Sequence, residues 1–112
     1  MLSSKNRINK GDFDRIFEKG KLFSSPVFTL KIIHEEALKN PQCAVVVSKK
    51  IETKAVRRNY MRRIVYTILS PYIQKQSLKP AFYIFMVRKP ALSMTFKELE
   101  KEIDFILKKA TI

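Results

Sequence analysis

Residues 48–63 constrain this chain more than any other part of it, because they combine strong positive charge with the hydrophobic pattern of a helix. One acidic residue, Glu52, stands among seven basic ones: Lys49, Lys50, Lys54, Arg57, Arg58, Arg62 and Arg63. At about 100° per residue on a helical wheel, one side of the helix carries Val56, Tyr60, Met61, Ile64, Val65 and Ile68. The other side carries Arg58, Asn59, Arg62, Arg63 and Tyr66. The pattern predicts an amphipathic helix that packs its first side on a sheet and exposes its second side.

The polar side of this helix has the chemistry of a nucleic-acid contact. Guanidinium groups form paired hydrogen bonds with phosphate oxygens, and Asn59 can reach a ribose hydroxyl or a base edge. The alternative is an ordinary solvated helix face. Such faces usually mix both signs of charge, and this segment does not, so we favour nucleic acid.

The composition of the whole chain points the same way. In 112 residues, 23 Lys and Arg stand against 10 Asp and Glu, a net charge of +13. A surplus of this size repels itself unless a polyanion offsets it. The length is that of about one domain, and the hydrophobic fraction of 46% is enough for a folded core. We therefore expect one ordered domain that binds a polyanion.

A membrane location is not expected. The longest apolar run, residues 81–87, is far too short to span a bilayer, and residues 1–10 are polar and basic, unlike a secretory signal. The single cysteine, Cys43, cannot form an internal disulfide and lies in an apolar run, so we expect it in the core. These features favour a cytoplasmic protein.

A first helix is predicted near the N-terminus. Asp12 is a plausible N-cap, and Phe13, Ile16 and Phe17 follow at helical spacing. Gly20 stands where such a helix would end.

Three strands are predicted next, at residues 21–25, 27–33 and 42–48. The second alternates between two sets of side chains, Phe28, Leu30 and Ile32 on one face and Thr29 and Lys31 on the other. The third is a β-branched run typical of a central strand. We expect these strands to form an antiparallel sheet.

The basic helix should begin after Thr53 as its N-cap and run to about Leu69, where Ser70 and Pro71 interrupt or kink it. A last strand is predicted at residues 81–88.

A C-terminal helix follows, because Thr95 and Glu98 form a capping box. Its apolar stripe consists of Phe96, Leu99, Ile103, Ile106 and Leu107. The predicted order is α-β-β-β-α-β-α, a single-domain, two-layer α+β sandwich.

The motifs in the basic segment resemble the signature of the bacterial ribonuclease P protein component. The matching residues are Ser48-Lys49-Lys50, Ala55-Val56, Arg58-Asn59 and Arg62-Arg63. Weaker matches extend over nearly the whole chain: Arg7-Ile8, Asp12-Phe13, Ile16-Phe17, Lys19-Gly20 and Arg88-Lys89. The resemblance implies a ribosomal protein S5 domain 2-like fold with a left-handed β-α-β crossover. It also implies a non-catalytic protein subunit of an RNA-based endoribonuclease, which removes the 5′ leader from precursor tRNA.

The same resemblance implies two sets of binding residues in one RNA-binding domain, residues 1–112. Those expected on the catalytic RNA are Lys49, Lys50, Lys54, Arg58, Asn59, Arg62 and Arg63. Those expected on the precursor tRNA leader, in a cleft between the first helix and the sheet, are Phe13, Phe17, Lys31, Arg88 and Lys89. The protein would have no catalytic residue and no metal site, and Mg²⁺ would be held mainly by the RNA.

Three positions depart from the family pattern. Tyr60 replaces the second arginine of an Arg-Asn-Arg triplet, and by the wheel it leans toward the core. Tyr66 replaces a basic residue and, on the wet face, could stack on a base. Lys31 replaces an aromatic residue of the cleft strand and would hold the leader backbone.

No catalytic constellation competes with this interpretation, since the sole histidine, His34, stands at a strand end without arranged partners. Two other binding functions remain open. A ribosomal or ribosome-assembly protein could use the same helix on ribosomal RNA without affecting any cleavage. A DNA-binding regulator would need a helix-turn-helix pair and a dimer interface, which the sequence does not suggest.

Overall fold

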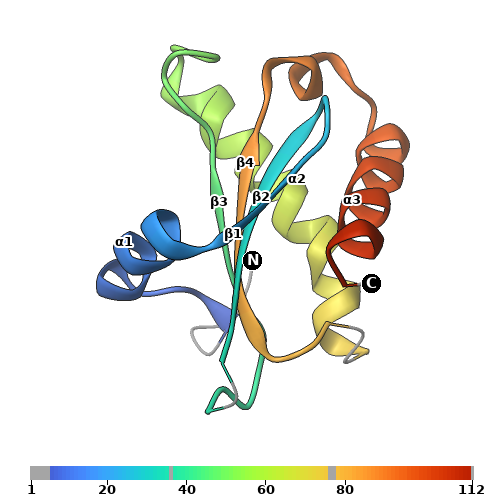
Figure 1. Ribbon diagram of the computed structural model, residues 1–112. Coiled ribbons are helices and arrows are strands. Elements are labelled where there is room, and N and C mark those ends of the chain that lie inside the picture. The colour runs from blue at the N-terminus through green and yellow to red at the C-terminus, as the bar shows by residue number, and fades with distance from the viewer. Residues whose placement is uncertain (1–5, 36, 76–77, 112) are drawn as a thin grey trace.

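The computed structural model describes residues 6–35, 37–75 and 78–111, which form a four-stranded sheet with helices on both faces (Figure 1). The elements are α1 (Lys10–Lys19), β1 (Lys21–Ser24), β2 (Phe28–His34), β3 (Gln42–Val46), α2 (Ala55–Gln74), β4 (Ala81–Val87), the short 3-10 helix η2 (Lys89–Ser93) and α3 (Phe96–Thr111). The predicted α+β class and element order are confirmed.

The strands lie in the order β1-β2-β4-β3. β2 pairs antiparallel with β1 and β4, whereas β3 runs parallel to β4, with Cys43 opposite Tyr83. The expectation of an antiparallel sheet with residues 42–48 as a central strand is therefore wrong, because β3 is an edge strand. Its apolar character reflects the cover it receives on both faces, where Cys43 and Val45 enter one core and Ala44 and Val46 pack against the other.

The connection from β3 through α2 to β4 is a left-handed crossover, as the resemblance implied. Both strands run upward in Figure 1, and α2 returns along the face on the right. Nearly all parallel β-α-β connections have the opposite hand, so this crossover is a strong topological marker.

The main core lies between the sheet and the helices α2 and α3 (Figure 1). β2 points Phe28, Leu30 and Ile32 into it, which confirms the predicted alternation of that strand. The helices supply their buried aliphatic side chains: Val65, Ile68 and Leu69 from α2, and Leu99, Ile103, Ile106 and Leu107 from α3. Most of the buried apolar area, and hence most of the hydrophobic stabilisation, is on this face.

A smaller core lies under α1 on the opposite face. Ile16 is fully buried against Phe82 and Ile84 of β4. The helix ends at Gly20 as predicted, because a Cβ there would lie 2.6 Å from the carbonyl oxygen of Ile16. This close approach turns the chain directly into β1.

The helix starts differ from two of the expectations. The side chain of Asn9, rather than Asp12, caps α1, accepting a 2.8 Å hydrogen bond from the Asp12 amide. At α2 the N-cap is Lys54, which makes no side-chain capping bond, so Thr53 does not cap this helix.

The end of α2 also differs from the prediction, which placed it at about Leu69. α2 continues through Pro71 to Gln74, because Tyr72 and Ile73 pack against the main core on the far side of the proline.

The predicted capping box is confirmed: Thr95 N donates to Glu98 Oε1 at 2.9 Å, and Glu98 N donates to Thr95 Oγ1 at 3.2 Å.

Candidate nucleic-acid interface

The first turns of α2 stand clear of the core. The buried residues of the helix all come from Met61 onward, whereas Val56 is 80% exposed and Tyr60 is 61% exposed. The helical wheel placed both on the core side, and for both it was wrong. A wheel assumes that the helix rests on its partner along its whole length, and here the core reaches only to Met61.

The basic residues expected on RNA all gather around this free end of α2. Lys49, Lys50 and Lys54 precede the helix and are exposed, as are Asn59 and Arg63, while Arg58 and Arg62 are half-buried. We call this set, Lys49, Lys50, Lys54, Arg58, Asn59, Arg62 and Arg63, the α2 basic surface. Arg62 donates a hydrogen bond to Asn59 Oδ1, which orders these two side chains one turn apart.

Arg58 has a structural task that the sequence did not reveal. Its Nη1 donates to the carbonyl oxygens of Glu52 at 3.0 Å and Thr53 at 2.8 Å. The guanidinium group therefore ties the connection before α2 to the helix itself. It was expected to be free for phosphate, and part of its donor capacity is already used.

The acidic charge within residues 48–63 is largely withdrawn from the surface. Glu52 lies 3.5 Å from Arg57 Nη1, and its other carboxylate oxygen accepts from the Lys54 amide at 3.3 Å. The side chain of Glu52 is only 14% exposed. The potential around the free end of α2 is therefore positive, which attracts a polyanion.

Tyr66 lies on the sheet side of α2, not on its wet face as expected. Its hydroxyl oxygen accepts a 3.2 Å hydrogen bond from the amide of Val45. The ring packs against the main core, and burial raises the pKa of Tyr66. Tyr66 thus satisfies an amide of the edge strand β3, a position that a strand edge otherwise leaves unpaired.

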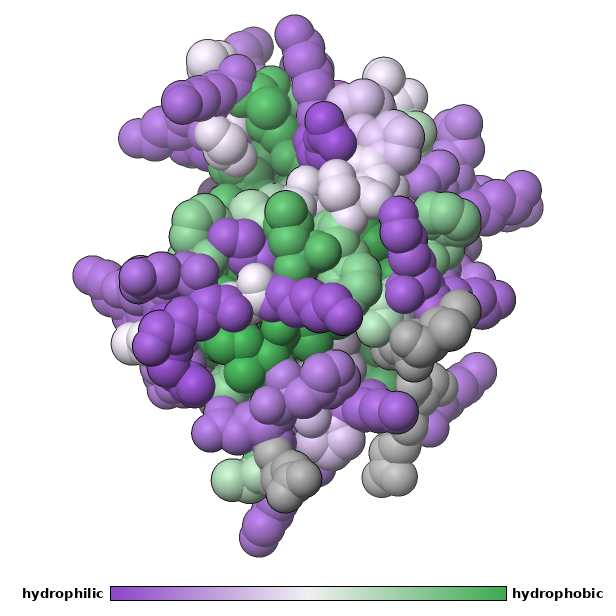
Figure 2. All heavy atoms as spheres, viewed as in Figure 1, coloured by the Kyte–Doolittle hydropathy of each residue, from purple (hydrophilic) through white to green (hydrophobic). Residues whose placement is uncertain are grey.

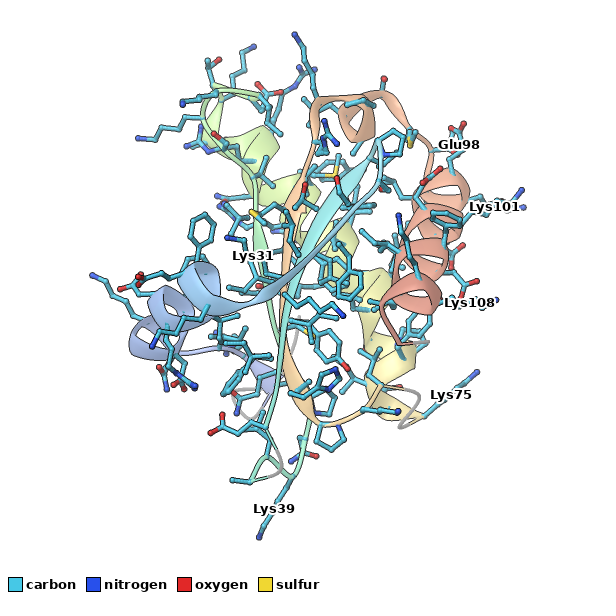
Figure 3. The ribbon with its side chains drawn as sticks, viewed as in Figure 1. Lys31, Lys39, Lys75, Glu98, Lys101 and Lys108 are labelled. Atoms are coloured by element: carbon cyan, nitrogen blue, oxygen red, sulfur yellow. The ribbon has the colours of Figure 1, made fainter. Side chains whose placement is uncertain are left out.

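Three of the five residues expected on the leader form a second group, on the α1 face of the sheet. Phe13 and Phe17 stack with ring centroids 5.9 Å apart, and the Lys31 ammonium lies 4.1 Å from the centroid of Phe17. Lys31 also donates a hydrogen bond to the Phe17 carbonyl oxygen. Figure 3 shows Lys31 between α1 and the sheet. We call Phe13, Phe17 and Lys31 the α1 aromatic surface.

Arg88 and Lys89 lie apart from the α1 aromatic surface. Ile84 pairs with Lys31, and Arg88 is four residues farther on, just past the end of β4, which corresponds to about 13 Å at the rise of a strand. Arg88 Nη1 donates to the carbonyl oxygen of Ser25 at 2.8 Å. Arg88 therefore joins β4 to the β1–β2 turn, and Lys89 begins η2.

Possible metal ligands do not cluster in the part of the chain that the structure describes. No group of three or more His, Cys, Asp or Glu side chains among the described residues could hold a metal ion. His34 is exposed at the end of β2, and burial raises the pKa of the Cys43 thiol to about 12. In the described part of the chain, no helix is both long and apolar enough to cross a bilayer.

Hydrophilic side chains project around most of the outline of the molecule, with hydrophobic side chains visible between them (Figure 2). A compact α+β fold with a basic helix end and a separate aromatic pair next to a lysine has the side chains typical of an RNA-binding protein. Comparisons of this chain with known proteins agree with this class. The family model described as Ribonuclease P matches residues 2–111. The chain belongs to the ribonuclease P protein family: it is the protein subunit of this tRNA-processing endoribonuclease, and the protein is the non-catalytic subunit.

Individual relatives cover nearly the whole chain. The ribonuclease P protein component of Bacillus velezensis is 29% identical over 99% of this chain and 94% of its own length. That of Listeria welshimeri is 34% identical over 96% of this chain and 89% of its own length. The solved ribonuclease P protein of Staphylococcus aureus superposes with a TM-score of 0.83 at 26% identity, covering 96% of each chain.

Proposed function

We propose that the α2 basic surface binds the catalytic RNA of ribonuclease P. The observation that carries this proposal is the concentration of cationic side chains at the free end of α2, beside a single, mostly buried carboxylate, Glu52. Each phosphate that these side chains neutralise releases condensed counterions, which favours binding. The chain then acts as one RNA-binding domain whose partners are RNA, without a role for DNA or a membrane.

The α1 aromatic surface is proposed to hold the 5′ leader of precursor tRNA. Phe17 is exposed, and the Lys31 ammonium lies over its ring. When a base stacks on this ring, Lys31 moves from the ring to the phosphate next to the base. Stacking on an aromatic ring is tolerant of sequence, which suits a leader that varies. Arg88 and Lys89, about 13 Å away along the sheet, would contact a more distant part of the same strand.

The chemistry of cleavage is proposed to belong to the RNA. Mg²⁺ would be held mainly by RNA phosphates, because the described residues offer no cluster of carboxylates for it. The protein would then position the leader and offset the repulsion between two polyanions. We expect this work to take place in the cytoplasm.

The test is the cleavage of a 5′-labelled precursor tRNA by a bacterial ribonuclease P RNA at low Mg²⁺, with and without the protein. We expect the protein to restore cleavage at the mature 5′ end. The double variant Lys49→Glu, Lys50→Glu should lose this effect. A control with the same change of charge is Lys75→Glu, Lys101→Glu, whose side chains point outward from the far end of α2 and from α3 (Figure 3).

Two results would contradict the proposal. If both double variants lose activity equally, total charge matters and the α2 basic surface does not. If the protein binds RNA tightly but leaves cleavage unchanged, the α2 basic surface binds RNA but has no role in leader removal. That result is expected of a ribosomal or assembly protein.

A further inference from the structure

A groove of about 510 Å³ lies beside the free end of α2, outside both surfaces described above. One wall comes from α2 and the other from η2 and the start of α3, segments more than 25 residues apart in sequence. Its apolar lining consists of Tyr60, Met61, Ile64, Leu92, Met94 and Phe96.

Two aromatic rings in this groove are open to solvent. Tyr60 is the exposed residue that the wheel had assigned to the core, and Phe96, the first residue of the α3 stripe, is 44% exposed. The other four members of that stripe are buried in the main core. An exposed aromatic from each wall of one groove is the arrangement that holds a flat, apolar group.

The charge around the groove selects the kind of flat group. Arg57 lines the groove and is exposed, and Arg63 is three residues beyond Tyr60, so the two arginines lie near the tyrosine on the helix surface. The acids nearby are engaged: Glu52 pairs with Arg57, and Glu98 is held in the capping box with Thr95. An apolar floor with a cationic rim suits a base attached to phosphates better than it suits an apolar protein segment.

We propose that this groove binds one unstacked base of the RNA that the α2 basic surface holds. The base stacks on Tyr60, and Arg57 and Arg63 meet the phosphates on either side of it. This inference rests on the proposed function for the identity of the RNA. It adds base stacking to a contact that the α2 basic surface otherwise makes through charge.

The first measurement is the affinity for ribonuclease P RNA of Tyr60→Ala and Tyr60→Phe. Removing a stacked ring should weaken binding by about 5- to 150-fold, and Tyr60→Phe should bind within about twofold of the unchanged protein because it keeps the ring. Phe105→Ala is the matched control, since Phe105 is an exposed aromatic of α3 that does not line the groove.

The second measurement uses fluorescence, because the chain contains no tryptophan. Tyr60→Trp places a single reporter in the groove, and Phe105→Trp places one outside it. Saturating RNA should quench the first much more than the second. Inorganic tripolyphosphate, which offers charge without a base, should leave both emissions nearly unchanged.

The proposal is overturned if Tyr60→Ala binds the RNA as tightly as the unchanged protein and the emission of Tyr60→Trp does not respond at saturation. This result is expected if the groove binds an apolar protein segment and not a base. The proposed function would still stand in that case, because it is judged separately by leader cleavage and by the Lys49 and Lys50 variants. If Tyr60→Ala proves unstable, the fluorescence comparison alone decides.

Discussion

Arg58→Ala should destabilise the folded protein as well as weaken RNA binding. The side chain donates to two carbonyl oxygens, and of these two bonds the one to Glu52 is partly buried whereas the one to Thr53 is exposed. Water can replace the exposed bond, but the partly buried carbonyl loses a charge-assisted partner, so the expected cost is about 2 kcal/mol. For a chain of this length, this corresponds to a fall in Tm of about 8 °C.

Thermal unfolding followed by circular dichroism measures this cost directly. Arg63→Ala is the matched control, because Arg63 is an exposed arginine on the same helix and should change stability by no more than about 0.5 kcal/mol. If Arg58→Ala and Arg63→Ala unfold at the same temperature, the two hydrogen bonds contribute nothing and the structural role of Arg58 is refuted. If they differ as expected, RNA-binding losses of Arg58 variants must be corrected for the unfolded fraction.

Four other outcomes follow from the structure. Tyr66→Phe removes the acceptor for the Val45 amide and should cost about 1–2 kcal/mol in urea unfolding; an unchanged midpoint would contradict the bond. Burial raises the pKa values of Tyr72 and Tyr83 to about 12, above the unfolded value of about 10. The stability they contribute is therefore complete below about pH 10 and lost as the pH rises toward 12, and Tyr83→Phe should flatten this decline in urea unfolding midpoints. Cys43, buried with a pKa of about 12, should react with a thiol reagent at pH 8 only after denaturant is added; rapid reaction of the native protein would show that β3 opens. Affinity for RNA should fall steeply between about 50 and 200 mM salt, and a flat dependence measured by filter binding would remove the electrostatic argument.

The parts of the fold that depend on local chemistry could be predicted from the sequence. The capping box of Thr95 and Glu98, the end of α1 at Gly20 and the alternation along β2 each depend on a few neighbouring residues, and all three are confirmed. The place of β3 could not be predicted in this way. An apolar strand covered on both faces has the same sequence pattern at the edge of a sheet as at its centre, and only the pairing with β4 distinguishes the two positions.

The candidate site was predictable in composition but not in detail. The concentration of positive charge in residues 48–63 is visible in the sequence, and these residues do gather at one end of α2. Which of them are free is a matter of tertiary contacts. Arg58 reaches back to the preceding connection, Tyr66 turns to β3, and Tyr60 projects beyond the core. The helical periodicity of the sequence does not predict these three outcomes, because each depends on contacts with residues outside α2.

The strand order also bears on how this chain reaches its fold. β4 lies between β2 and β3 in the sheet but follows both in sequence, and Gln42 pairs with Phe82, which is 40 positions farther along the chain. Among the strands of the described residues, β1 and β2 alone can pair early, through a short hairpin ending at Ser24 and Thr29. Both cores contain side chains of β4, so during synthesis neither can be completed before residues 81–87 leave the ribosome. Closing such long-range pairs is slow, and until then the apolar faces of β2 and β3 are exposed to other chains.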